Sequence, residues 1–232
     1  MEQTPDTNQP LSAQANRWMF QTWIDALTKP NQAFYSELGK SPNATTKTAW
    51  LWVFIGTLLG GVIGGVLSLI FGTQGLGQLA NMLGGSELGG EFVMPAVTGG
   101  VAGLLCGAPA GALLGTLGFG IGVYIQNWLA KLLGGEGPVD AFAYVSAAYT
   151  APLAAISSVL GAIPLIGVIG SLVSLYGLYL NVLTLHSVKQ LSWGKAVLVL
   201  LIPLVVVGLL VGCLLLLLGP AIAAVYMDAM GQ

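Results

Sequence analysis

Apolar residues dominate the chain in long continuous stretches, and polar residues gather between these stretches. An α-helix needs about 20 apolar residues to cross the hydrocarbon core of a bilayer. Five stretches satisfy this, and none of them contains Asp, Glu, Lys or Arg. The pattern predicts an all-α integral membrane protein in which residues 48–232 form one membrane domain. The expected spans are about 48–71, 95–122, 141–161, 164–186 and 196–218.

A different pattern precedes the first span, within an N-terminal segment of residues 1–47. Between residues 13 and 28, apolar side chains recur at the i, i+3, i+4, i+7 spacing of one helical face. This predicts a short amphipathic helix just ahead of the membrane. Tryptophans on such a helix favour the headgroup region, and the alternative is packing against the ends of the spans. The apolar positions are Phe20, Trp23, Ile24 and Leu27.

A second short interfacial helix is expected after the second span, around Trp128, ended by Gly134 and Gly135. It resembles the N-terminal helix in its mixture of aromatic, aliphatic and basic residues. The exposed aromatic positions of the two helices are the surfaces on which a partner would dock. The candidate docking residues are Trp18, Phe20, Trp23 and Trp128.

Glycine recurs at every fourth position of the second span. A glycine in a water-exposed helix costs about 1 kcal/mol relative to alanine, so the row needs a compensating role. Residues four apart share one helical face, where a row of glycines lets another backbone approach closely. We expect the row to pack on matching glycines of the first span, with self-association and a pore or sliding surface as alternatives. The two rows are Gly99, Gly103, Gly107, Gly111 and Gly115, and Gly56, Gly60 and Gly64.

Charge is sparse and unevenly placed. Charged residues make up 7% of the chain, against about 25% in soluble domains. All seven basic residues fall on one side of a five-span arrangement. By the positive-inside rule, the N-terminus is expected in the cytoplasm and the C-terminus outside. The expected partners are the lipid bilayer and other membrane proteins or a second copy, with no nucleic acid.

Catalytic chemistry finds little support in the sequence. The chain has one histidine, His186, which excludes a metal site built from several histidines, and we expect no cofactor. Ion-coupled transporters and proton relays place ionisable groups within the bilayer, and the spans carry none. Tyr176, Tyr179 and Asn181 approach His186 along the fourth span and are candidates to line a small polar cavity with it. The sequence therefore predicts a protein that is not an enzyme.

Residues 144–203 resemble the membrane domain of the Yip1 family. The likeness lies in Tyr149 ahead of Pro152, the turn at residues 164–167, the run around Tyr176 and Tyr179, and His186 before a short polar link. The N-terminal string WIDALTKPNQAFY is similar to the lead-in of bacterial members. The resemblance implies five spans and a cytoplasmic N-terminus, in agreement with the apolar runs and the charges.

The resemblance implies less about function. Eukaryotic members of the family are associated with small Rab-type GTPases and vesicle traffic, and they carry an Asp-Leu-Tyr-Gly-Pro motif. This chain has no such string, so GTPase binding is not carried over. The bacterial type of lead-in indicates a prokaryotic plasma membrane. We expect a scaffold, partner-binding or membrane-organising protein; the alternatives are a transport or channel subunit and an accessory subunit of a larger membrane complex.

Overall fold

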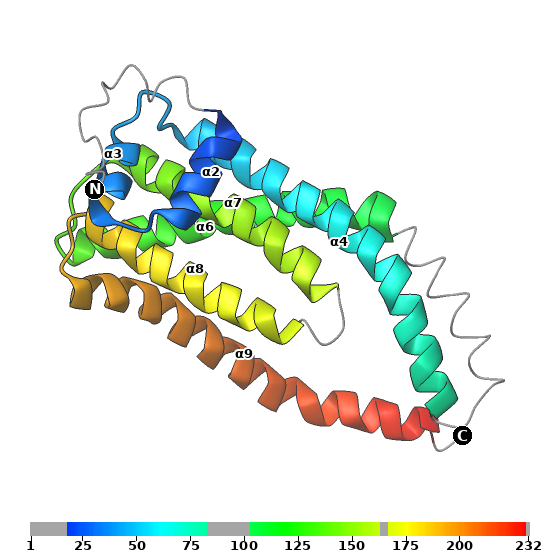
Figure 1. Ribbon diagram of the computed structural model, residues 1–232. Coiled ribbons are helices and arrows are strands. Elements are labelled where there is room, and N and C mark those ends of the chain that lie inside the picture. Colours follow the sequence, from blue (N-terminus) through cyan, green and yellow to red (C-terminus); the bar gives the residue numbers. More distant parts are fainter. Residues whose placement is uncertain (1–17, 83–102, 163–166, 231–232) are drawn as a thin grey trace.

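The computed structural model describes residues 18–82, 103–162 and 167–230, and within these ranges every regular element is helical. The expected all-α architecture is confirmed. Residues 95–102 of the expected second span and the start of the fourth lie outside the described residues. The elements are α2 (Met19–Thr28), α3 (Gln32–Gly39), α4 (Thr46–Met82), the π-helical turn η1 (Gly103–Gly107), α6 (Ala108–Leu132), α7 (Val139–Gly161), α8 (Gly167–Val188) and α9 (Trp193–Met230) (Figure 1).

Four of these helices are long and apolar enough to cross a membrane, and a fifth apolar helix, Leu172–Val188 within α8, is shorter. This agrees with an integral membrane protein of about five spans. Helices α4 and α9 continue past the ends of their described spans. The four spanning segments are Thr46–Leu67, Leu104–Leu132, Val139–Gly161 and Trp193–Leu210.

Helix α7 is the centre of the bundle. It contacts α2, α3, α4, α6 and α8, and its first half is buried on nearly all sides. Alanine and serine dominate this half, for example at Ala143, Ala147 and Ala148, which are fully buried. Small side chains let neighbouring helices approach closely, which is the main source of helix association in a bilayer. The composition of α7 thus explains why it lies in the middle.

The glycines of α4 pack on α7, which corrects the expectation that Gly56, Gly60 and Gly64 would face the second span. A Cβ atom added at Gly56 would lie 2.5 Å from the carbonyl oxygen of Ala151, and one at Gly64 would lie 2.8 Å from that of Ser158. The reason is that α7 offers its own small residues along the same length. The second span instead meets α4 on an adjacent face, where Gly61 lies against Ala108 and Gly65 lies against Leu104.

The second span enters its α-helix through the π-helical turn η1, and Pro109 lies in the first turn of α6. Proline has no N–H to donate to the preceding turn, and the π-helical turn directly before it is where the backbone pairing of this continuous helix departs from the α-helical pattern. From Ala108 the helix runs without a break to Leu132, so the separate interfacial helix expected around Trp128 is instead the end of α6. The helix ends just before Gly134, whose φ of +84° favours glycine.

Candidate functional site

The two short helices α2 and α3 cover one end of the bundle, where α6 and α8 end and α7 and α9 begin (Figure 1). Lys131 of α6, Lys195 of α9 and Lys189, the residue that follows α8, lie at this end, and we call it the lysine-bearing end. The N-terminus of α4 is fixed here by α7, because the backbone N–H and the hydroxyl of Thr46 both donate to Asp140 Oδ1. A carboxylate at this position also suits the positive end of the α4 dipole.

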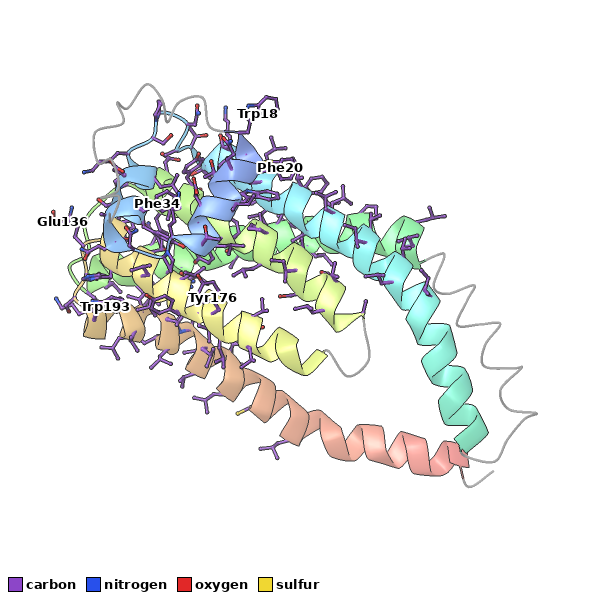
Figure 2. The ribbon with its side chains drawn as sticks, viewed as in Figure 1. Trp18, Phe20, Phe34, Glu136, Tyr176 and Trp193 are labelled. Carbon is purple, nitrogen blue, oxygen red and sulfur yellow. The ribbon has the colours of Figure 1, made fainter. Side chains whose placement is uncertain are left out.

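Trp23 is not available as a docking residue, contrary to expectation. It is 5% exposed, and its ring lies edge-on to that of Trp52, with ring centroids 6.4 Å apart. It shares the inner face of α2 with Thr22 and Ala26, and this face packs on α7. Trp18, which is 77% exposed, and Phe20 point away from the bundle (Figure 2). The residues of the apolar stripe therefore differ in their surroundings: Trp23 packs inside the bundle, and Phe20 is exposed.

Helix α3 was missed by the sequence analysis, although its start carries a clear signal. Asn31 caps it, with the N–H of Phe34 donating to Asn31 Oδ1 over 2.7 Å. Tyr35 is fully buried, and its hydroxyl donates to the carbonyl of Ala26 at 2.8 Å. Burial raises the pKa of Tyr35 above its ordinary value. The Asn cap ahead of the apolar positions Tyr35 and Leu38 could have predicted this helix.

The lysine-bearing end contains a buried cation. Lys189 is 0% exposed, and its Nζ donates to Asn127 Oδ1 at 2.6 Å and to the carbonyl of Gly137 at 2.7 Å. The ammonium also lies 5.7 Å from the ring centre of Phe142. The backbone N–H of Glu136 in turn donates to the Lys189 carbonyl at 2.9 Å. One side chain thus ties the α6–α7 loop to the end of α8.

Sequence reasoning counted Lys189 only as an interfacial charge. Its partners Asn127 and Gly137 lie 62 and 52 residues away in the chain, so no local pattern could have identified the contact. Gly137 has a φ of +95° and approaches the carbonyl of Val188 so closely that an added Cβ atom would lie 2.6 Å from it. The glycine is therefore required by both its backbone conformation and the tight docking of the loop.

Burial, with a smaller repulsion from Lys131, lowers the pKa of Lys189 to about 8. The unfolded chain keeps a lysine pKa near 10.4 and therefore binds more protons than the folded chain between pH 8 and pH 10. The free energy of unfolding should therefore rise with pH in this window. As the pH falls through 8, Lys189 becomes protonated in the folded chain as well, and this pH-dependent increase disappears. We expect the free energy of unfolding in detergent to increase by roughly 1–2 kcal/mol from pH 7.5 to 9.5. A flat profile would contradict this, and Lys189→Met should abolish the increase.

The four residues expected to line one polar cavity do not share one in the structure. Tyr176 stacks on Tyr179, with ring centroids 6.2 Å apart, and its hydroxyl donates to the carbonyl of Leu27. The His186 ring stacks on Trp193 at 4.7 Å. Asn181 alone of the four lines the cavity described below between α6, α7 and α8. Tyr176 and His186 instead hold neighbouring elements together at or near the lysine-bearing end.

One face of the second span is open along the end of η1, which contains Gly107, and along α6, which contains Gly111 and Gly118. A Cβ atom added at Gly107, Gly111 or Gly118 would meet no atom within 4 Å in the described part of the chain. At about 100° per residue these three glycines fall within a sector of about 40°, and we call them the open glycine face. Gly115, at the margin of this face, contacts Thr57. Gly99 lies outside the described residues, and Gly103 begins η1.

The chemistry that these features support is binding of helices and lipids. The exposed side chain of Leu114 lies beside the open glycine face. Leu113, Leu117 and Trp128 are exposed on other parts of the α6 surface. Among the described residues, no group of three or more His, Cys, Asp or Glu side chains could hold a metal ion.

A comparison with protein families agrees with this architecture. The family model described as Yip1 domain matches residues 24–216, which reach from α2 into α9 and include every apolar helix of the bundle. No curated protein and no solved structure matches the chain.

Proposed function

The chain belongs to the Yip1 domain family of membrane proteins, and from this premise we propose that it is a non-enzymatic membrane scaffold. The scaffold binds a transmembrane helix of another chain on the open glycine face of α6. The observation that supports this proposal is the contrast between two sets of glycines. Gly56, Gly60 and Gly64 of α4 are covered by α7, whereas Gly107 at the end of η1 and Gly111 and Gly118 of α6 have no atom of the described chain within 4 Å of an added Cβ.

Physical chemistry favours a helix as the ligand of this face. Lipid tails are as apolar as leucine, so apolar contact alone does not bring helices together in a bilayer. Close backbone approach over small residues does, through van der Waals packing and weak Cα–H···O contacts. Gly107 and Gly111 have the same four-residue spacing as Gly56 and Gly60, which pack on α7 in this protein. A partner helix carrying small residues would find the same fit.

We place the lysine-bearing end in the cytoplasm of a prokaryotic cell, with the protein in the plasma membrane. The positive-inside rule supports this orientation. Exposed Trp18 and Phe20 of α2 suit the headgroup region beside that end. In this arrangement α2 anchors the N-terminal segment on the bilayer with its outer face, while its inner face packs on α7.

A leucine on the open glycine face tests the proposal. Gly111→Leu should fold, because its side chain meets open space, and should release the bound chain. The measurement is native mass analysis after gentle extraction from the membranes in which the protein resides. Gly208→Leu is the matched control, because Gly208 of α9 is equally open.

The expected result is a stoichiometric partner on the wild type and on Gly208→Leu, reduced at least tenfold on Gly111→Leu. If the partner is a second copy of this chain, the face serves self-association. If the partner is a different chain, the protein is part of a larger complex. A wild-type protein that is extracted as a lone monomer would contradict the scaffold and favour a transport role.

A further inference from the structure

A cavity of about 210 Å³ lies between α6, α7 and α8 and is partly open. One wall is formed by α6 and is mainly apolar, and the opposite wall is formed by hydroxyl and amide side chains of α7 and α8. The residues that line it are Phe119, Gly122, Val123, Gln126, Ser146, Tyr149, Thr150 and Asn181.

Two oxygens on the polar wall are buried without a hydrogen-bond partner in the described part of the chain. They are Ser146 Oγ and Asn181 Oδ1, and Ser146 is only 3% exposed. Other hydroxyls of these helices bond back to their own backbone, as Ser158 does to Ala154 at 2.9 Å and Thr184 does to Leu180 at 2.8 Å. Buried polar groups left unpaired are rare and call for an explanation.

The lining contains no Asp, Glu, Lys, Arg or His. An ionic group entering from lipid or water would lose its hydration without gaining a counter-charge, so the cavity selects a neutral occupant. Both unpaired oxygens can accept a hydrogen bond, which a hydroxyl group can donate. The cavity volume of about 210 Å³ is many times the ~10–15 Å³ of cavity that one water molecule needs, and it is enough for a three-carbon polyol.

We propose that this cavity binds a neutral polyol group, whose hydroxyls donate to Ser146 Oγ and Asn181 Oδ1. The group comes from the head of an uncharged lipid or from a free polyol. Gly122 lines the cavity, and an added Cβ atom there would meet nothing within 4 Å in the described chain, so a larger side chain at this position would extend into free space at the cavity. Because Gly122 lies within a membrane-spanning helix, the partly open cavity lies at membrane depth, where a lipid can reach it when no partner helix covers the open glycine face.

The test uses the full-length protein in phosphatidylcholine vesicles that contain a monoacylglycerol with a photoreactive group beside its glycerol head. Gly122→Leu places a larger side chain at the cavity and leaves every polar group of the lining in place. Asn181→Leu removes one unpaired acceptor and should fold at least as well as the wild type, because that oxygen has no partner to lose. Gly208→Leu is the control on α9, where a leucine likewise meets open space.

The expected result is labelling of the segment around Ser146 and Thr150, reduced about tenfold in Gly122→Leu and in Asn181→Leu and unchanged in Gly208→Leu. Displacement of the label by unlabelled monoacylglycerol but not by glycerol assigns a lipid source, and displacement by both assigns a free polyol. Labelling that is equal in the wild type and Gly122→Leu, or that is confined to surfaces outside the cavity, would overturn the proposal and leave the cavity to water.

Discussion

Replacement of Gly56 by leucine is expected to separate α4 from α7 and to destabilise the fold more than any other substitution considered. A Cβ atom alone at this position would lie 2.5 Å from the carbonyl oxygen and 2.8 Å from the Cα of Ala151. These are backbone atoms, which a change of rotamer cannot move. Overpacking a core usually costs about 1–3 kcal/mol, and a clash with the backbone of the central helix should exceed this range.

The measurement is the free energy of unfolding in mixed detergent micelles, obtained by titration with a denaturing detergent. The same substitution at Gly111 is the matched control, because it adds the same leucine where nothing lies within 4 Å in the described chain. Gly111→Leu should retain wild-type stability or gain up to about 1 kcal/mol from its higher helix propensity. Equal stability of the Gly56 and Gly111 variants would contradict the observed packing of α4 on α7.

The second large effect is expected for Lys189→Ala. Its removal leaves Asn127 Oδ1 and the carbonyl of Gly137 without their donor and opens a cavity beside Phe142. Unpaired buried acceptors and lost packing together should cost about 3 kcal/mol. Lys189→Met fills the space but cannot donate, so we expect it to lose less than alanine does.

Lys195→Ala is the control for this second prediction. Lys195 also donates to a backbone carbonyl, that of Leu133 at 2.9 Å, but its side chain is exposed. Interactions of exposed charged side chains contribute about 1 kcal/mol or less, so the control should stay near wild-type stability. If Lys189→Ala unfolds at the same denaturant concentration as Lys195→Ala, Lys189 does not hold the α6–α7 loop in place.

The element types could be predicted from the sequence because they depend on local patterns. Long apolar runs in a bilayer can satisfy their backbone only as helices, and the runs at residues 48–71 and 141–161 became α4 and α7. The i, i+3, i+4, i+7 spacing likewise predicted α2. The cap at Asn31 also involves only neighbouring residues, so α3 could have been predicted from the sequence in the same way.

The partners of these elements could not be predicted in the same way. A glycine at every fourth position defines a smooth face but does not say which helix will occupy it. The rows of α4 and α6 have the same spacing, yet Gly56 meets Ala151 while Gly111 meets open space. Likewise, Trp23 and Phe20 belong to one apolar stripe, and only packing on Trp52 separates their roles. These outcomes depend on contacts between residues distant in the chain.

Site-specific crosslinking within the native membrane tests the scaffold most directly. A photoreactive residue at Leu114 would lie beside the open glycine face, and one at Leu210 on α9 is the control, since both leucines are similarly exposed. We expect a defined crosslinked chain from position 114, which is lost in the Gly111→Leu background, and only lipid adducts from position 210. Lipid adducts alone from both positions would contradict the claim that α6 binds the helix of another chain.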